Sequence, residues 1–268
     1  MPRSATVRHY VMCPPTEFTV DYAINPWMDT SVAVDPARAM QQWRVLHQTY
    51  LDLGHTVEVM DPEPGLPDMV FAANGALVIG ARALQARFAF PQRRDEAHAH
   101  ARFLEAAGVE VHEPVARNEG EGDFLVVGQL VLAGVGPRTE KDAHAEAEAV
   151  FGRQVLSLEL VDPRFYHLDT CLGVLDDETI AYYPPAFSFA SRTALERHFP
   201  DAVIADESDA DVLGLNFVSD GRNVVLADRA TGLADQLSAR GYLPLPLDLS
   251  ELVKAGGNVK CCTLERYP

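Results

Sequence analysis

A unit that recurs along the chain, a β-hairpin followed by a helical stretch and a short β-rich run, constrains the fold more than any other feature. Hairpins are predicted in MVFAANGALVIGARALQARF, GDFLVVGQLVLAGVG, CLGVLDDETIAYYPPAF and LGLNFVSDGRNVVLADRAT. Their turns carry Asn-Gly, Gly-Gln, Asp-Asp-Glu and Asp-Gly, residues that tight β connections favour. Apolar residues recur three or four positions apart after each hairpin, which predicts helices over 93–107, 139–151, 188–198 and 231–240.

A short predicted strand closes each unit, in the runs VEVHE, QVLSLEL, AVIAD and YLPLPL. The N-terminal part fits the same scheme, with a helix over 36–53 and the strand HTVEVM. The closing strands start at His55, Val109, Val155, Ala202 and Tyr242, and this spacing of about 40–54 residues is typical of a repeat architecture. Five units without a Gly/Ser-rich linker favour one α/β domain in a closed array, although an open parallel α/β sheet would give the same pattern.

The composition limits the possible partners. The chain has 268 residues, of which 47% are hydrophobic, and its 22 basic and 39 acidic residues give a net charge of −17. That charge repels phosphate backbones and anionic membrane surfaces, so nucleic-acid and membrane partners are not expected, whereas a small cation is attracted. No apolar run has the length of a signal peptide or a membrane-spanning helix, which predicts a cytoplasmic protein.

Two of the four cysteines are adjacent, which raises the question of a thiol nucleophile. Cys13, Cys171, Cys261 and Cys262 lack CxxC spacing, so neither a disulfide framework nor a zinc site is expected, and no cofactor is predicted. The run NVKCCTL after a double glycine is expected to be extended, which places Cys261 and Cys262 on opposite faces. At most one thiol can then face a cleft, and two buried structural thiols are the alternative.

The segment FYHLDTC supplies the histidine best placed to serve such a nucleophile. His167 and Asp169 would share one face of an extended segment, where a carboxylate can stand beside a proton-transfer group. A structural His–carboxylate pair is the alternative for the same spacing. His98 and His100 would lie about 200° apart around the predicted helix over 93–107, so they are expected to be solvated rather than to bind a metal.

Acidic and polar residues gather where two hairpins open. They are Glu119, Glu121 and Asp123 in NEGEGDFLV, and Asp68, Phe71 and Asn74 in LPDMVFAANGALV. The three carboxylates of the first group are suited to holding a cation, or they belong to a solvated loop. Groups at the openings of several repeats can converge on a central axis when the array is closed, so these residues are candidates for one site.

Six sequence blocks occur in one order along nearly the whole chain: CPPTEFTVDYAINPWM, LPDMVFAANGALV, EGEGD, FYHLDTC, YYPPAF and KAGGNVKCCTL. They resemble the guanidine-modifying superfamily, which includes arginine deiminases, dimethylarginine dimethylaminohydrolases and arginine:glycine amidinotransferases. The arginine dihydrolase branch is the most similar. The resemblance implies a five-bladed, pseudo-symmetric α/β propeller, the pentein fold, built from ββαβ units and forming a single catalytic domain over residues 1–268.

The resemblance also implies roles for individual residues. Cys261 would be the nucleophile, His167 the general acid and base, and Glu119 a catalytic carboxylate that grips a guanidinium group. The other candidates would bind substrate: Asp169 at a guanidinium nitrogen, Phe71, Asp68 and Asn74 along the pocket, Asn25 at its mouth, and Arg87 and Arg138 at the amino-acid carboxylate. No metal is implied.

The implied reaction is hydrolysis of the guanidino group of free L-arginine through a covalent thiouronium intermediate, with release of ammonia and either ornithine or citrulline. Asn74, where deiminases and dimethylargininases have an acid, and Asp169, where dimethylargininases commonly have a lysine, favour arginine as substrate. Three alternatives stay open: hydrolysis of dimethylarginine to citrulline and dimethylamine, amidino transfer to an acceptor amine, and arginine binding without catalysis. The partner expected is a small molecule, and a homo-oligomer is compatible with the sequence.

Overall fold

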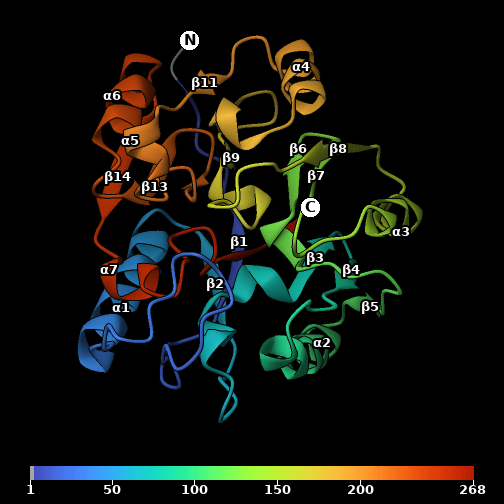
Figure 1. Cartoon of the computed structure of the whole chain (residues 1–268), viewed down its shortest axis with the longest axis vertical. Helices are drawn as coiled ribbons and strands as arrows, with labels where there is room; N and C mark the ends of the chain where they lie inside the picture. The colour runs from blue at the N-terminus through green and yellow to red at the C-terminus, as the bar shows by residue number, and fades with distance from the viewer. Residues whose placement is uncertain (1–2) are drawn as a thin grey trace.

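Repeated three-stranded groups organise the fold (Figure 1). Across residues 3–268, which the computed structural model describes, five groups share one connectivity: the second strand pairs antiparallel with the first and parallel with the third. A helix joins the second strand to the third in each group, and Figure 1 shows these helices at the periphery. The ββαβ unit expected from the sequence is therefore present.

Four of the groups follow one another along the chain. They are β3 (Ala76–Ile79), β4 (Arg82–Gln85), α2 (Arg94–Ala106) and β5 (Glu110–His112); β6 (Phe124–Val127), β7 (Leu130–Val135), α3 (Asp142–Phe151) and β8 (Val155–Glu159); β9 (Leu172–Val174), β10 (Ile180–Tyr182), α4 (Phe189–His198) and β11 (Val203–Ile204); β12 (Val218–Ser219), β13 (Asn223–Ala227), α6 (Thr231–Ala239) and β14 (Leu243–Leu247). The predicted helices and closing strands agree with these bounds to within three residues.

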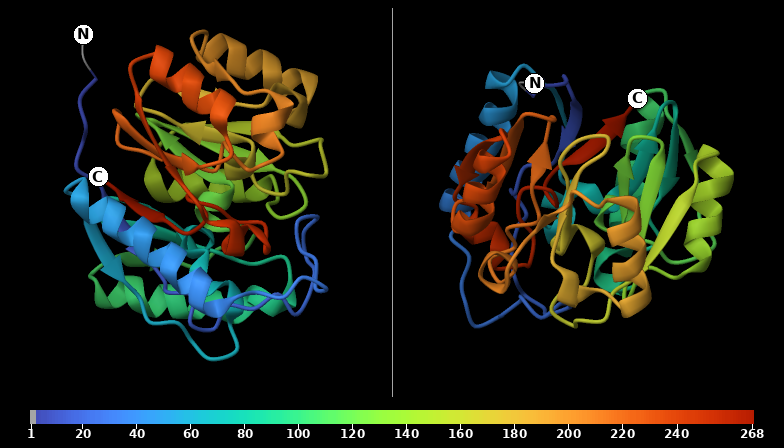
Figure 2. Two further views of the ribbon diagram at one scale, coloured as in Figure 1. Left: turned by 90° about the vertical axis from the view of Figure 1, so that its left-hand side faces the viewer. Right: turned by 90° about the horizontal axis from the view of Figure 1, so that it is seen from above.

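The remaining group combines segments from both ends of the described chain. Its first strand is β15 (Leu264–Tyr267), and it is completed by β1 (His9–Met12), α1 (Pro36–Asp52) and β2 (Thr56–Val59). Because β15 also pairs parallel with β3, two groups merge into a six-stranded sheet of order β2-β1-β15-β3-β4-β5. Figure 2 shows the first and last described segments of the chain on the same side of the molecule.

Local sequence explains where the helices begin and end. The side chain of Asp35 accepts hydrogen bonds from two backbone N–H groups of the first turn of α1, and Pro36 fits that turn because no partner is needed for its missing N–H. Gly152 ends α3 with a φ of 64°, a left-handed conformation that glycine adopts without strain. None of the helices within residues 3–268 has the length and apolar character needed to cross a membrane.

One predicted turn was wrong, and the error leads to the site. Asn74 and Gly75 do not connect β3 to β4; the register Ile79↔Arg82 leaves Gly80 and Ala81 as the turn. Gly80 has a φ of 61°, as such two-residue turns require. The Asn-Gly pair instead ends a 3₁₀ turn, Ala72–Gly75, that leads into β3.

Comparable turns precede the first strands of other groups. A 3₁₀ turn over Gly120–Gly122 leads into β6, and another over Leu168–Thr170 leads into β9. Two short helices, α5 (Glu207–Ala210) and α7 (Ser250–Val253), precede β12 and β15. These entry segments hold most of the residues considered below.

Candidate active site

The candidate residues lie where the first strands begin. Asn74 precedes β3, Glu119 precedes β6, His167 precedes β9, Asn216 precedes β12 and Cys261 precedes β15. Each of these side chains is at most 2% exposed. Because the groups share one connectivity, the same position in each group brings these side chains to the same end of the inner strands.

The thiol of Cys261 lies against an amide and a carboxylate. The Asn216 side-chain amide donates to Cys261 Sγ at 3.2 Å and to the Asp169 carbonyl at 3.0 Å, and its oxygen accepts from Cys261 N at 3.1 Å. Asp169 Oδ2 is 3.4 Å from the same sulfur. Asn216 was not predicted as a site residue, although its position at the opening of the hairpin LGLNFVSDGRNVVL matches that of Asn74.

These surroundings set the ionisation of the thiol. Burial, and then the charge of Asp169, raise the pKa of Cys261 well above its ordinary value. Burial also raises the pKa of Asp169 to about 7, against the opposing effects of Lys260 and of hydrogen bonds with Cys261 and Asn216. The thiol is therefore protonated until a cation enters, because a nearby positive charge favours both the thiolate and the carboxylate.

His167 is held by Glu119 rather than by Asp169. His167 Nε2 is 2.7 Å from Glu119 Oε2, and the same oxygen accepts from Arg138 Nη1 at 2.7 Å. Burial opposes ionisation of Glu119, but Arg138 and His167 outweigh it and hold the pKa of Glu119 well below its usual range. His167 Nδ1 is buried and has no hydrogen-bond partner among residues 3–268, so it can exchange a proton with a ligand.

A third cluster surrounds Arg93. Its guanidinium donates to Asn74 Oδ1 at 2.7 Å and to Glu96 Oε2 at 2.8 Å, and its Nε is 3.7 Å from Asp68 Oδ2. Asp68 Oδ2 also accepts from the Tyr22 hydroxyl at 2.8 Å. Sequence analysis missed Arg93, because nothing in PQRRDEAHAH distinguishes it from its exposed neighbour Arg94.

Several buried polar atoms of the site have no partner within the described chain. They are Asp68 Oδ1, Asp169 Oδ1, Asn74 Nδ2 and His167 Nδ1. A buried polar atom without a partner costs free energy, so such a group indicates a place for a ligand or water. The two carboxylate oxygens would accept the N–H groups of a guanidinium, which carries five such donors and no acceptor.

Two glycines allow side chains of the clusters to pack closely against the backbone. A Cβ atom added at Gly257 would overlap the Phe71 ring and lie 3.0 Å from Cys261 Cβ, so the ring packs against the backbone beside the thiol. A Cβ at Gly122 would lie 2.6 Å from Asn74 Nδ2 and 2.9 Å from His167 Nδ1. Both positions allow close approach because glycine has no side chain.

The segment after β1 covers the site. Ile24 accepts from Arg138 Nη2 at 2.8 Å through its carbonyl, and Asn25 donates to the Ala255 carbonyl at 3.0 Å. Trp27 Nε1 donates to the Arg164 carbonyl at 2.9 Å. These contacts place Asn25 beside Ala255, and its role at the mouth of the site stays a prediction.

Two predictions of extended structure were wrong. The run NVKCCTL folds as a turn, in which Cys262 N donates to the Asn258 carbonyl at 3.2 Å, and β15 begins only at Leu264. Cys262 nevertheless lies in the core with Tyr50. His167 and Asp169 flank and occupy a 3₁₀ turn, so they do not share a strand face and contact different partners.

Three further predictions are corrected by burial. His100 is 1% exposed, not solvated, and its Nδ1 hydrogen-bonds the Glu96 carbonyl; His98 is exposed as expected. Arg87 is exposed and donates to the Val115 carbonyl on the surface, so the structure does not bring it to the site. The solvated-loop alternative for the carboxylates near Glu119 fails as well, because Glu121 is buried and paired with Lys260 at 2.6 Å.

Metal ligation finds no support in the described residues. Within residues 3–268, no group of three His, Cys, Asp or Glu side chains has a metal-binding arrangement. The sequence-based expectation that the protein needs no metal or other cofactor stays a prediction.

Comparison with known proteins gives the family. The chain is an α/β enzyme of the guanidine-modifying, or pentein, superfamily. The chain belongs to the arginine deiminase family, whose sequence profile matches residues 37–213.

Relatives with two different names are similar to this chain. The N(G),N(G)-dimethylarginine dimethylaminohydrolase of Mycobacterium tuberculosis is 56% identical over 269 residues, which cover 99% of this chain and 88% of that protein. The bifunctional arginine dihydrolase/ornithine cyclodeaminase ArgZ of Synechocystis sp. is 37% identical over 261 residues, which cover 95% of this chain but only 37% of the longer ArgZ.

Solved structures of the ArgZ N-terminal domain have the same fold. The domain bound to substrate, as a Cys-to-Ser mutant described as an arginine dihydrolase, matches with a TM-score of 0.94 and 35% identity, covering 97% of this chain and 98% of that one. An Asn-to-Ser mutant of the domain, covalently bonded to a reaction intermediate, matches with a TM-score of 0.93 and 35% identity, covering 97% of this chain and 100% of that one.

Proposed function

We propose that this chain hydrolyses the guanidino group of an arginine-type amino acid through a covalent intermediate on Cys261. Membership of a family of guanidino hydrolases supports the reaction class. The observation that carries the assignment of residues is the position of the Cys261 thiol, 3.2 Å from the Asn216 amide and 3.4 Å from Asp169. The His167–Glu119 pair lies at the same end of the inner strands.

The reaction begins when the guanidinium binds between carboxylates. The unpaired oxygens of Asp68 and Asp169 accept its N–H groups and hold its plane, and its charge lowers the pKa of the thiol. The Cys261 thiol gives its proton to His167, and the thiolate, stabilised by the N–H donor of Asn216, attacks the central carbon and forms a C–S bond.

Proton transfer by His167 completes the cycle. The imidazolium, which Glu119 stabilises, gives a proton to the departing nitrogen as the C–N bond breaks, leaving a thiouronium on Cys261. Water then attacks the same carbon and His167 takes the proton, so that the C–S bond breaks and citrulline leaves. A second cycle on the ureido carbon would release ammonia and carbon dioxide and give ornithine.

Nω,Nω-dimethylarginine is the first candidate substrate. The relative with 56% identity over nearly the whole chain is named for that activity, whereas the relatives named for arginine dihydrolase activity are 37% identical. This ranking of the two substrates is the reverse of the ranking expected from Asn74 and Asp169. Dimethylamine and citrulline would be the products.

Unsubstituted arginine is the second candidate, and one geometric observation favours it. Asp68 Oδ1 and Asp169 Oδ1 both need an N–H donor, and they belong to different entry segments of the site. Arginine carries N–H groups on all three guanidino nitrogens, whereas the dimethylated nitrogen offers none. The similarity to the substrate-bound ArgZ domain supports the same substrate.

Product identification tests the proposal and ranks its substrates. The protein is incubated separately with dimethylarginine, with arginine, and with arginine plus glycine, and every product is identified by mass spectrometry. Dimethylamine with citrulline supports the first substrate, ammonia with citrulline or ornithine the second, and guanidinoacetate would reveal amidino transfer. If no substrate is consumed, or if a Cys261→Ser variant retains turnover, the proposed function is wrong.

The architecture expected from the resemblance is part of the proposal. We infer that the five groups close into a five-bladed propeller and act as one catalytic domain, since β15 pairs with both β1 and β3 and links the first group to the next. A cytoplasmic location is proposed because the four cysteines are unpaired thiols, as a reducing compartment favours. Homo-oligomer formation stays a prediction from the sequence.

A further inference from the structure

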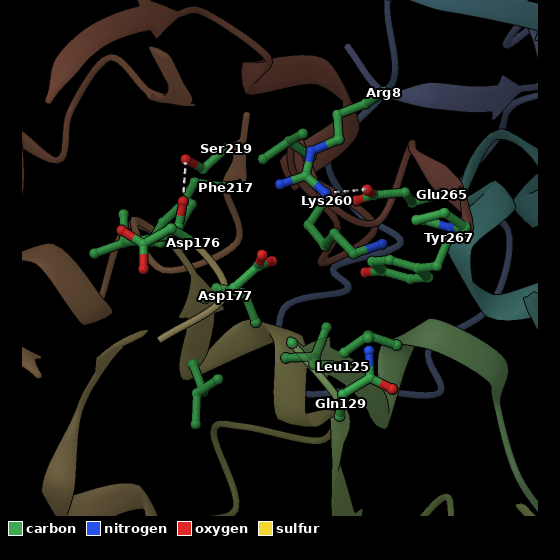
Figure 3. Close-up of a pocket in the computed structure, with 18 of the residues that line it drawn as sticks. Arg8, Leu125, Gln129, Asp176, Asp177, Phe217, Ser219, Lys260, Glu265 and Tyr267 are labelled. Atoms are coloured by element: carbon green, nitrogen blue, oxygen red, sulfur yellow. Dashed lines mark hydrogen bonds and ion pairs between the residues drawn. The ribbon is translucent and has the colours of Figure 1, made fainter. Parts of the chain in front are cut away.

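A cavity lies at the opposite end of the strands that lead away from the candidate active site. The candidate residues precede β6, β9, β12 and β15, whereas this cavity, called the rear cavity below, extends along the inner strands from Phe217 and Lys260 near their starts to strand ends and hairpin turns that include Gln129, Asp177, Ser219 and Tyr267 (Figure 3). Its volume of about 310 Å³ is in the range of small-molecule pockets. Neither the thiol nor the imidazole of the candidate active site lines it, so it is a separate site.

Two cations on one side of the rear cavity have hydrogen-bond donors to spare. Lys260 Nζ donates to Glu121 Oε2 at 2.6 Å and to the Thr263 carbonyl at 2.8 Å, which leaves the third of its three N–H groups for the cavity. Arg8 Nη1 pairs with Glu265 Oε1 at 3.3 Å, and the guanidinium carries further N–H groups beyond this pair. Both side chains line the cavity.

An acidic side chain faces these cations from the other side. Asp176 is fully engaged, because it accepts from Arg3 at 2.7 Å and from the Tyr242 hydroxyl at 2.6 Å. Asp177 is exposed at the rim and pairs with no cation in the part of the chain that the structure describes. Figure 3 shows Asp177 reaching into the cavity across from Arg8 and Lys260.

The wall between the charges is apolar. Leu125 on β6, Leu172 on β9 and Phe217 just before β12 line the rear cavity. Burial of an aliphatic group there is worth about 25 cal/mol per Å² of surface removed from water. A ligand that fits must therefore carry a negative group, a positive group and a short apolar part.

We propose that the rear cavity binds a free α-amino acid with an aliphatic side chain. Its carboxylate takes the spare donors of Arg8 and Lys260, its ammonium group pairs with Asp177, and its side chain packs on the apolar wall. A simple anion would leave Asp177 unpaired and repelled, and a simple cation would leave the two donors unused.

Calorimetric titration with three matched probes tests the proposal on the full chain. The probes are L-leucine, 4-methylpentanoate, which lacks the amino group, and 3-methylbutylamine, which lacks the carboxylate. Leucine is expected to bind with a dissociation constant of about 1 mM or below, and each analogue about tenfold more weakly, because each loses one charged hydrogen-bonded group. Absence of leucine binding up to about 10 mM, or equal binding of an analogue, would overturn the proposal.

Two variants assign the ends of the ligand to their partners. Asp177→Asn is expected to weaken leucine binding about tenfold without weakening 4-methylpentanoate binding, whereas Arg8→Gln weakens both of these and does not weaken 3-methylbutylamine binding. Glu178→Gln is the control, since it removes the same charge from the next, exposed residue outside the cavity. If Asp177→Asn behaves like this control, leucine binds elsewhere and the proposal fails.

Discussion

The candidate active site and the rear cavity lie at opposite ends of the same inner strands, yet their charges are arranged differently. At the first end, Glu119, His167 and Cys261 are buried; His167 is hydrogen-bonded to Glu119, and Cys261 is hydrogen-bonded to Asn216. At the second end, Asp177 is open to solvent. The difference teaches that covalent chemistry needs a dry network with fixed geometry, whereas reversible binding needs only charges of opposite sign around an accessible space.

The largest expected effect distinguishes the two adjacent thiols at the first end. Cys261→Ser should reduce turnover roughly 10³-fold or more, because the nucleophile is lost. Cys262→Ser should change the rate only slightly, because Asn216 and Asp169 contact the sulfur of Cys261 rather than that of Cys262. Initial rates of both purified variants, with their folding checked by circular dichroism, provide the measurement. Similar losses in the two variants would contradict the assignment of the nucleophile.

The next effect concerns the buried ion pair between Lys260 and Glu121. At about pH 9, Lys260→Met leaves the fully buried Glu121 carboxylate without its cation and should destabilise the protein by about 3–5 kcal/mol, and a second change, Glu121→Gln, should restore most of the loss. Denaturant unfolding of both variants provides the measurement. Equal stability of the single and double variants would mean that loss of the Lys260 cation leaves no destabilising charge on Glu121.

The pH dependence of this loss has a definite sign. Burial raises the pKa of Glu121 to about 8 although Lys260 lowers it, so the carboxyl stabilises the fold below its unfolded pKa and this stability is lost as the pH rises through 8. Removing Lys260 raises the pKa of Glu121 further. Unfolding curves of Lys260→Met at about pH 6 and pH 9 should therefore show the larger loss at the higher pH.

A smaller effect is expected for Asn216, one of the two residues that sequence analysis missed. Asn216→Ala removes the N–H donor to the sulfur, and a hydrogen bond to a charged group is worth about 1.5–3 kcal/mol, so kcat should fall roughly 10- to 100-fold. The pH profile of Cys261 alkylation by iodoacetamide should shift upward in this variant, whatever the substrate proves to be. An unchanged alkylation profile would limit Asn216 to holding the backbone.

Protonation of Asp169 should lower kcat/KM about tenfold per pH unit. Burial raises the pKa of Asp169 to about 7, so the free protein loses its guanidinium-binding charge as the pH falls below 7. The ratio kcat/KM should fall correspondingly below pH 7, and the slope should disappear in Asp169→Asn. A flat wild-type profile from about pH 7 to pH 5.5 would contradict this role.

The smallest effect is expected for Arg87, which the structure places outside both ends. Arg87→Ala should leave kcat/KM within about twofold, because surface changes away from a site are usually neutral. Arg138→Ala should lower it strongly, since Arg138 pairs with Glu119 inside the site. Comparable losses in both variants would restore the role that sequence resemblance gave to Arg87.

The sequence predicted the repeat well because periodicity is a local signal. Apolar spacing located the helices, including α1 and α2, to within three residues. It did not reveal that β15 supplies the first strand of the group containing β1, because that pairing joins segments more than 250 residues apart. Fold elements were therefore predictable, whereas the closure between the ends needed the structure.

The candidate site was predicted in part for similar reasons. Cys261, His167, Glu119 and Asp169 were found through sequence blocks that resemble the family, and the structure brings them to one end of the strands. The hydrogen-bond partners of these residues were predicted less well, since the entry segments are short turns rather than extended strands. The sequence also could not separate a buried arginine such as Arg93 from its surface neighbours, because burial at this position depends on distant segments.

The position of β15 bears on how the protein would lose activity when it is heated. This strand lies between β1 and β3 inside a six-stranded sheet, so its backbone hydrogen bonds open only when the sheet itself comes apart. The sulfur in the turn just before it is therefore anchored to the interior of a sheet rather than to a sheet edge. Inactivation by gentle heating should therefore coincide with cooperative melting and not precede it.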